Sequence, residues 1–122
     1  MNVALWIGQG VLAALFAVSG SAKSAMSKER MIATGQTGVR EFPLPVIRVV
    51  AALELLAVIG LLVPQATGLA PVLTPLAALG LAVVMVGAAV AHARLHERGT
   101  SAVNLVIMLL CLAVAIGRLA GL

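Results

Sequence analysis

Glu54 is a lone carboxylate in the middle of an apolar run that extends from residue 46 to residue 63. The run is long and apolar enough to cross a bilayer, so we expect the carboxylate to lie at membrane depth. A bare charge there costs about 2.5–3.5 kcal/mol on insertion scales. Glu54 must therefore be paired, protonated or hydrated, which makes it a candidate for ligand binding or proton handling.

Other polar residues are predicted to lie at one level of the membrane, just below Glu54. Lys23 ends the first apolar run, Arg48 begins the second, His92 ends the third and Asn104 begins the fourth. In an antiparallel bundle these ends meet, and Glu54 leans toward them because helical side chains tilt toward the helix N-terminus. The pattern predicts a polar cavity. In the alternative interpretation the cations extend to lipid head groups, and Glu54 makes one bond that fixes helix register.

The remaining reactive side chains favour no other chemistry. His92 and His96 have the i, i+4 spacing that can hold a metal, but they lie in a basic loop that disfavours a dication. Cys111 is the only cysteine, so the chain cannot run a dithiol cycle by itself. The sequence contains no phosphate loop, nucleophile elbow or catalytic triad. We therefore expect no metal and no covalently bound cofactor, and whether the chain is an enzyme stays open.

The composition places these residues in a membrane protein. Hydrophobic residues make up 62% of the chain and charged residues 10%, whereas charged residues reach about 25% in soluble domains. A membrane-crossing helix needs about 20 residues, so four such helices and their connections use nearly all of the 122 residues. We predict an all-α integral membrane protein, built as a single antiparallel four-helix transmembrane bundle.

Prolines and polar residues bound the predicted spans. The second span follows Pro43 and Pro45 and stops at Pro64, because proline cannot continue a helix. The first connection mixes apolar and charged residues from 24 to 34 and is followed by Gly35, so we predict a short interfacial helix there. The four spans are residues 3–22, 46–63, 71–91 and 102–119.

The positive charges predict the orientation of the bundle. Seven of the eight Lys and Arg residues fall in or beside the first and third connections, and only Arg118 falls on the other side. Cytoplasmic loops carry an excess of Lys and Arg, so both charged connections should be cytoplasmic and both termini outside. The net charge of +4 is no sign of nucleic-acid binding, because the sequence has no basic stripe with interleaved aromatic residues. The expected surroundings are a lipid bilayer.

A set of residues spread over the whole chain forms one pattern. Its most specific feature is the spacing of Arg48 and Glu54 behind a proline-containing loop. The other members are Gly20 and Lys23 in the first span, Gly60 to Pro64 in the second, Met85, Ala88, Ala89 and His92 in the third, and Asn104 in the fourth. The pattern resembles the DoxX-like family of four-span bacterial membrane proteins. The family often has glycine where this chain has Ala51, a departure that concerns helix packing and not the charged pair.

The resemblance implies a bacterial inner (plasma) membrane protein linked to redox chemistry. Combined with the polar level described above, it suggests a small subunit that binds a quinone or another small polar ligand in a cavity formed by Arg48, Glu54 and His92. Glu54 or His92 would handle the proton, and Lys23 and Asn104 are further candidates. Because the chain lacks paired thiols, haem ligands and flavin motifs, any redox role needs a quinone or a partner redox subunit.

Two other functions are compatible with the same sequence. One is a non-enzymatic assembly subunit that stabilises a larger membrane complex through small-residue helix faces. The other is a minimal transporter, which is disfavoured because a single four-helix copy lacks the inverted repeat that such carriers use. The sequence does not decide the ligand, the partner proteins or whether the chain forms a homo-oligomer.

The charge bias makes a direct prediction about topology. A cysteine introduced between Gln65 and Gly68 should react with a membrane-impermeant thiol reagent in intact cells, because this uncharged connection is expected outside. Reaction only after permeabilisation would reverse the orientation.

Overall fold

The computed structural model describes residues 2–121, and all regular secondary structure in that range is helical, with no strand. Four of its helices are long and apolar enough to cross a membrane. They are α1 (Asn2–Ala25), α3 (Leu44–Thr67), α4 (Leu73–Arg94) and α5 (Arg98–Leu119). The predicted four-helix membrane bundle is confirmed, and each helix extends beyond the apolar stretch predicted for it at one end or both.

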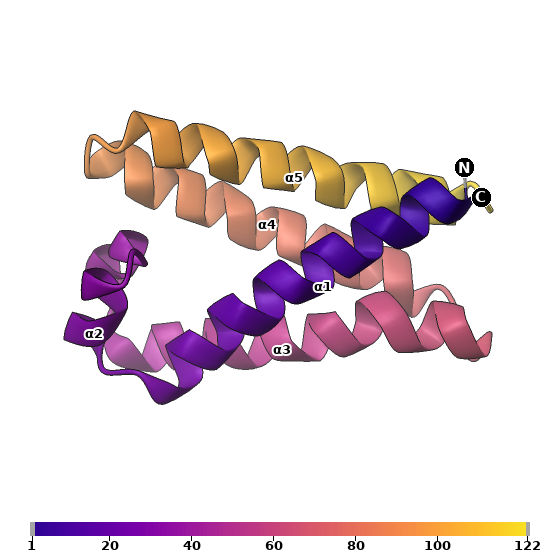
Figure 1. Ribbon diagram of the computed structural model, residues 1–122, viewed down its shortest axis with the longest axis horizontal. Coiled ribbons are helices and arrows are strands. Elements are labelled where there is room, and N and C mark those ends of the chain that lie inside the picture. Colours follow the sequence, from indigo (N-terminus) through magenta and orange to yellow (C-terminus); the bar gives the residue numbers. More distant parts are fainter. Residues whose placement is uncertain (1, 122) are drawn as a thin grey trace.

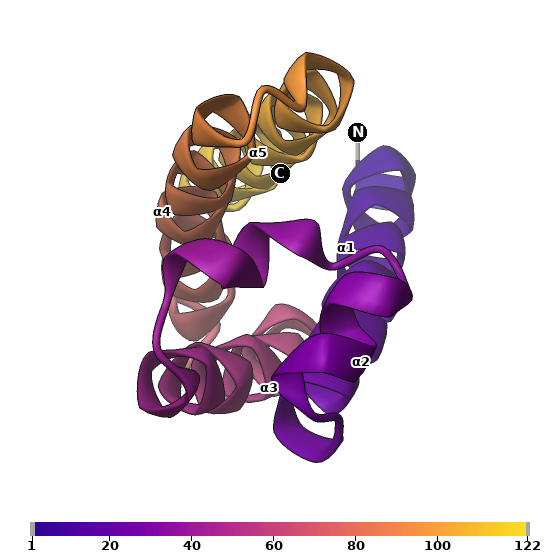
Figure 2. The ribbon, with the colours of Figure 1, turned by 90° about the vertical axis from the view of Figure 1, so that its left-hand side faces the viewer.

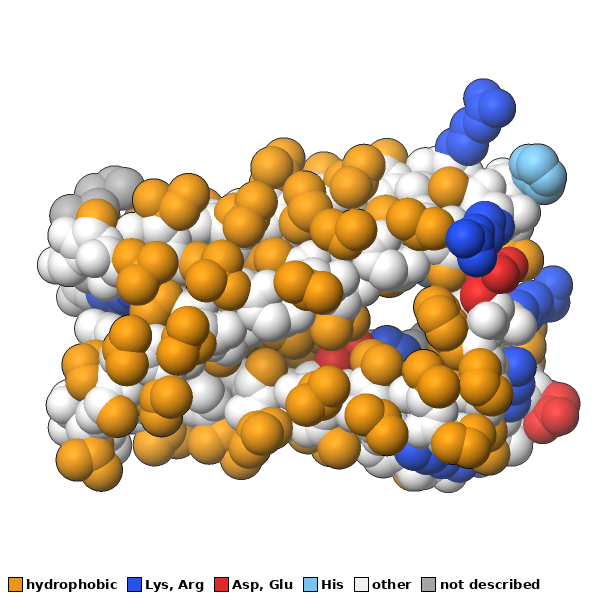
Figure 3. All heavy atoms as spheres, turned by 180° about the vertical axis from the view of Figure 1, so that it is seen from behind, with side chains coloured by type: hydrophobic (Ala, Val, Ile, Leu, Met, Phe, Trp, Pro, Cys, Tyr) orange, Lys and Arg blue, Asp and Glu red, His pale blue; other side chains and the backbone are white. Residues whose placement is uncertain are grey.

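Large apolar side chains cover the outside of the four long helices, and charged side chains gather at one end (Figure 3). Such a surface suits lipid and not water, since soluble proteins rarely expose extended apolar patches. The charged end carries the first connection and the turn between α4 and α5, whereas the two termini lie at the opposite end (Figure 1). The chain is therefore a multi-pass membrane protein.

The four long helices pack closely at the end that holds the termini and separate toward the charged end. Helix α1 crosses the bundle diagonally (Figure 1). Its first half packs on α5, where a Cβ on Gly117 would lie 2.7 Å from Leu5 and a Cβ on Gly8 would lie 3.3 Å from Val114. Its second half packs on α3, where Gly20 lies against Leu55. The diagonal leaves space between the helices at the charged end.

A polar network closes the end that holds the termini. Arg118 donates to the side-chain oxygens of Gln9 (2.7 Å) and Asn2 (2.6 Å) and lies over the Trp6 ring, 5.4 Å from its centroid. Gln9 in turn donates to the backbone carbonyl of Leu61. These bonds link α1, α3 and α5 at a depth where unsatisfied polar groups are costly.

Pro64 does not end α3, contrary to the prediction from the sequence. The helix continues to Thr67 and ends at Gly68, which has the left-handed conformation (φ 72°) typical of a helix C-cap. Proline has no N–H to offer the carbonyl four residues earlier. The Thr74 hydroxyl on α4 donates to that carbonyl, on Gly60, at 2.8 Å. A side chain from the neighbouring helix thus replaces the missing backbone bond.

The first connection folds into a strap across the charged end of the bundle (Figure 2). We use the word strap for α2 (Lys28–Ala33) and the 3-10 helix η1 (Thr37–Glu41) together. The predicted short helix is present, capped by the Ser27 hydroxyl, which accepts the backbone N–H of Arg30 at 3.2 Å. The sequence did not predict η1. Buried Met31 and Val39 pack with Ile47 of α3 and hold the strap on the bundle.

The Thr74 hydroxyl supplies the hydrogen bond that Pro64 cannot donate. We therefore predict that the contributions of Pro64 and Thr74 to the free energy of unfolding are coupled. Thr74→Val should destabilise the protein by about 1 kcal/mol, since interhelical hydrogen bonds in membranes are worth about 0.6 to 1.7 kcal/mol. In a Pro64→Ala background the loss should be smaller, because residue 64 then has its own N–H for the Gly60 carbonyl. Reversible unfolding in mixed micelles measures both values.

Thr67→Val serves as the control for this experiment, because the Thr67 hydroxyl is exposed and donates within its own helix to Val63. Equal losses for Thr74→Val in the two backgrounds would contradict the proposed compensation.

Candidate functional site

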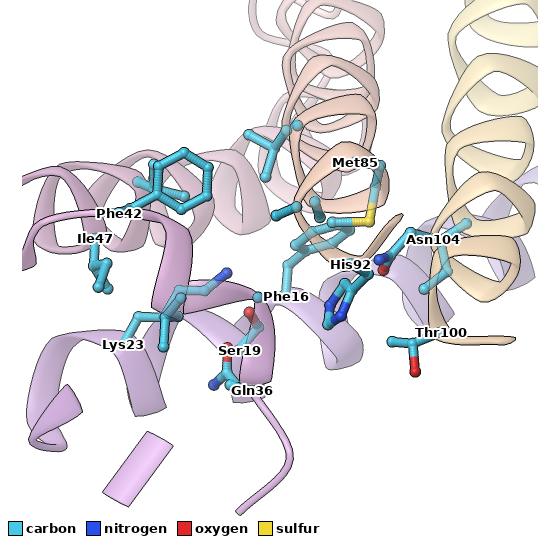
Figure 4. A pocket seen from close by; sticks show the side chains of 18 of the residues that line it. Phe16, Ser19, Lys23, Gln36, Phe42, Ile47, Met85, His92, Thr100 and Asn104 are labelled. Atoms are coloured by element: carbon cyan, nitrogen blue, oxygen red, sulfur yellow. The ribbon is translucent and has the colours of Figure 1, made fainter. Parts of the chain in front are cut away.

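A cavity of about 630 Å³ lies where the long helices separate, beneath the strap. Its walls come from α1, α3, α4 and α5 and its end from η1 (Figure 4), and Figure 3 shows the molecule hollowed in this region. Most of the lining is aliphatic or aromatic. The polar side chains in it are Ser19, Lys23, Gln36, His92, Thr100 and Asn104. Ligand sites typically have this composition: apolar walls with a few converging polar groups.

Glu54 points into the bundle and pairs with Lys23, as expected from the cost of a bare charge in the membrane. The Lys23 Nζ lies 2.6 Å from Glu54 Oε1, and the Glu54 side chain is fully buried. Glu54 belongs to the buried face of α3, together with Ile47, Ala51 and Leu61, and this face packs against α1. The ammonium lines the cavity and the carboxylate lies behind it, outside the lining. Glu54 therefore balances the charge of a cavity residue.

Arg48 does not line the cavity and Glu54 lies behind its lining, so of the three residues predicted to surround one space only His92 lines it. The Arg48 guanidinium donates instead to the backbone carbonyl of Lys23. The last four carbonyls of a helix have no partner within the helix, and α1 ends at Ala25, two residues further on. Arg48 thus caps α1 and fixes the backbone that carries the Lys23 side chain.

His92 is held by two residues that the sequence analysis did not name as site residues. Its Nδ1 lies 2.9 Å from Glu97 Oε1, and the Thr37 hydroxyl lies within 2.7 and 2.8 Å of the two Glu97 oxygens. Because a carboxylate only accepts hydrogen bonds, the pair places the ring proton on Nδ1 and leaves Nε2 for other partners. The hydrogen bonds from His92 and then Thr37 lower the pKa of Glu97 below its ordinary value.

Gly38 explains how the strap approaches His92 so closely. A Cβ at this position would lie 3.0 Å from His92 Nε2, which is closer than nearly all real contacts of a Cβ. Glycine therefore allows the backbone of η1 to lie against the imidazole. Gly38 and His92 both line the cavity, so the strap forms part of the cavity wall.

Asn104 carries a hydrogen-bond donor that the protein does not use. Its side chain lines the cavity and is nine-tenths buried, and its Nδ2 has no hydrogen-bond partner among residues 2–121. Buried polar groups are normally paired, because leaving one unpaired costs about 1–3 kcal/mol. One turn earlier, the Ser101 hydroxyl donates to the Ala89 carbonyl at 2.8 Å and fixes α5 on α4. Asn104 Nδ2 is therefore a buried donor beside the cavity that the described part of the fold leaves unsatisfied.

The cavity thus has hydrogen-bonding groups on opposite walls. Lys23 comes from α1, whereas His92 and Asn104 come from α4 and α5 (Figure 4). Within residues 2–121 no three metal-binding side chains of the His, Cys, Asp or Glu type come together, and His96 is exposed on the turn after α4. The geometry suits a ligand with polar atoms on a compact, otherwise apolar body.

The sequence model of the DoxX-like family matches residues 7–114, which is most of the chain. The matched region contains all four long helices in whole or in large part, the strap and every polar residue of the cavity. No curated protein and no solved structure gives a significant match.

The contacts of Glu97 predict that loss of its negative charge weakens the docking of the strap on the bundle. Glu97→Gln should weaken its hold, so that amide hydrogen exchange in residues 37–41 becomes roughly two- to fivefold faster, as expected for a partly exposed pair. The pKa of Glu97 is lowered in the folded protein. Its contribution is therefore fully present above the ordinary pKa of a glutamate and disappears as the pH falls through the lowered value.

Glu29→Gln is the matched control, because Glu29 is exposed on α2 and lies outside the contacts with His92. If both variants leave exchange in η1 unchanged, Glu97 does not hold the strap.

Proposed function

Because the chain belongs to the DoxX-like family and crosses the membrane with four helices, we propose that it is a small redox-associated subunit that binds a quinone head group in the cavity beneath the strap. Another small polar ligand with the same hydrogen-bonding pattern would fit the same groups. The observation that carries the proposal is the Asn104 side chain, which lines an apolar space together with Lys23 and His92 and whose buried Nδ2 has no hydrogen-bond partner among residues 2–121.

The hydrogen-bonding groups of the cavity match the oxygens of a quinone. Quinone carbonyls only accept hydrogen bonds. The Lys23 ammonium and the Asn104 Nδ2 are both hydrogen-bond donors. The apolar lining suits the ring between the two oxygens. The Glu54 carboxylate lies 2.6 Å from the ammonium and balances its charge, and Arg48 fixes the end of the helix that carries Lys23.

A bound quinone would supply two-electron chemistry coupled to two protons, with the electrons exchanged with a partner redox subunit. His92 is the residue best placed to move a proton, because Glu97 holds its Nδ1 and Nε2 remains at the cavity wall beside Gly38. The Glu97 carboxylate orients the ring by accepting a hydrogen bond from Nδ1. Glu54 is fully buried behind Lys23, so we assign it to charge balance and not to proton transfer.

We place the protein in the bacterial plasma membrane, with both termini outside and the strap on the cytoplasmic side. All Lys and Arg residues except Arg118 lie in or beside the strap and the turn between α4 and α5, as the positive-inside rule requires of cytoplasmic connections. In this orientation the cavity lies in the cytoplasmic half of the membrane.

An assembly subunit is the second candidate function, and the exposed surface of α1 favours it. Gly10 lies on the lipid-facing side, and a Cβ there would have nothing within 4 Å. A glycine on an open face lets another transmembrane helix approach closely. An empty cavity together with a stable complex containing another membrane protein would support this function over ligand binding.

Removal of the unused amide tests the proposed function. Asn104→Leu should weaken binding of a decyl-tailed benzoquinone in lipid nanodiscs about tenfold, as expected for the loss of one buried hydrogen bond. Gln65→Leu removes an amide that does not line the cavity and should leave the affinity unchanged. Equal affinities for the wild type and both variants would remove Asn104 from the site, and no binding to the wild type would exclude the quinone.

A further inference from the structure

The cavity continues into a groove on the lipid-facing side of the bundle. The groove lies between α3 and α4 toward the end that holds the termini, with a volume of about 680 Å³. Val84 lines both spaces. Among the side chains that line the groove only Thr67 is polar, so the groove offers almost nothing to a polar group.

The two spaces follow a single face of each helix. On α3 the cavity is lined by Val46 and Val50 and the groove by Leu53, Ala57 and Gly60, with successive spacings of three or four residues. That spacing keeps residues on one side of a helix. The cavity and the groove are therefore two parts of one seam.

The same rule holds for α4. The groove is lined by Leu73, Ala77 and Gly80, and the cavity by Gly87 and Ala91, again at intervals of three or four residues along one face, with Val84 between the two sets.

The seam has different depths along its length. In the groove the two helices touch, since a Cβ on Gly60 would lie 2.9 Å from the Ala77 Cβ, and the contact forms a shallow floor. Gly80 adds no side chain to the wall of the groove, and the space beside it is open, because a Cβ there would have nothing within 4 Å. Beyond Val84 the helices part and the seam deepens into the cavity. A molecule lying along it would have one end among polar groups and the rest among apolar side chains.

We propose that the ligand of the cavity is an amphiphile with one long apolar tail, and that the tail lies in the groove between α3 and α4. This inference rests on the proposed function, because the cavity holds the head group. From Leu73 to Val84 the helix rises about 16 Å, so the groove holds an extended chain roughly parallel to the bilayer normal.

The seam also determines the route by which the ligand arrives. The groove faces lipid, so a tailed molecule can enter sideways from the bilayer and slide its head group past Val84 into the cavity. Moving a tail from lipid to protein gives no hydrophobic gain, because lipid chains are as apolar as the groove. The tail therefore adds affinity through van der Waals packing alone, and it orients the head group toward Lys23 and His92.

Two benzoquinones with the same head group test the inference, one with a decyl tail and one without a tail. At equal mole fraction in nanodiscs, the wild type should bind the tailed compound about tenfold more tightly. Gly80→Phe should abolish this advantage by filling the groove, while leaving binding of the tail-less compound unchanged. Gly10→Phe is the matched control, since Gly10 is also an exposed helical glycine without neighbours and lines neither space.

A tail-labelled probe tests the same inference in the unaltered protein. A benzoquinone with a photoreactive diazirine in its tail should label α3 between Leu53 and Val63 and α4 between Leu73 and Val84. Labelling spread evenly over all lipid-facing helices would overturn the groove as a tail site.

The remaining outcomes separate the head group from the tail. If both benzoquinones bind equally and both require Asn104, the cavity binds the head group and the tail site is wrong. If neither binds, native mass spectrometry of the purified proteins decides. An amphiphile retained by the wild type and Gly10→Phe but lost from Gly80→Phe would support a tail site for a ligand with another head group. Equal retention, or no retention, in all three proteins would overturn it.

Discussion

The buried ion pair between Lys23 and Glu54 determines the shape of the cavity end of this protein. The fully buried Glu54 carboxylate cannot remain alone at this depth, because leaving a buried charge without its partner costs about 3–5 kcal/mol. The pair therefore holds the end of α1 on α3, and the bond from Arg48 to the Lys23 carbonyl adds a second link there. The start of α1 is meanwhile held on α5 by close contacts at Gly8 and Gly117.

A helix fixed to different neighbours at its two ends must cross the bundle diagonally. The space that α1 leaves at one end becomes the cavity, and the ion pair supplies that cavity with a charged wall. A leucine pair in place of Lys23 and Glu54 could fill the same contact between α1 and α3. It would leave no cation in the cavity lining, so the pair determines both the position of α1 and the charge of the cavity wall.

Elsewhere in the bundle, polar groups are closely matched to partners. Thr74 replaces the N–H that Pro64 lacks, Gln9 bonds the Leu61 carbonyl, and Ser101 bonds the Ala89 carbonyl. Against this background the buried Asn104 Nδ2, which has no partner among residues 2–121, stands out, because the Ser101 hydroxyl one turn earlier on the same helix is bonded. The second oxygen of Glu54 is also buried and without a hydrogen-bond partner among residues 2–121. Both atoms belong to the region around the cavity, so the exceptions and the proposed site coincide.

Hydropathy and charge were sufficient to predict the four helices, their antiparallel order and the inward direction of Glu54, because lipid imposes a simple rule on apolar length and on buried charge. The details that failed depend on contacts between distant segments. The sequence predicts a helix end at Pro64, because the hydrogen bond from Thr74 to the Gly60 carbonyl is not visible in it. It predicts Arg48 as a cavity residue, because the contact of Arg48 with the end of α1 is not visible either.

The partners of His92 illustrate the same limit. Glu97 follows it closely in the chain, but Thr37 lies 55 residues earlier on a segment whose 3-10 helix has no periodic signal of its own. Only the folded strap brings the threonine to the carboxylate. A glutamate five residues after an intramembrane histidine is the one signal that could have suggested the pair from the sequence.

The position of His92 between the strap and the cavity has a thermodynamic consequence. One ring nitrogen bonds the carboxylate that holds the strap, and the other lies against Gly38, which lines the cavity with His92. A hydrogen bond at one nitrogen of an imidazole polarises the other nitrogen, so a ligand bound as proposed would act on the strap through the same ring. Linkage then requires the effect to be reciprocal: whatever a ligand does to the docking of the strap, the docking of the strap does to the affinity of the ligand. In the proposed function, His92 would in this way transmit the binding of a ligand in the cavity to the strap at the membrane surface.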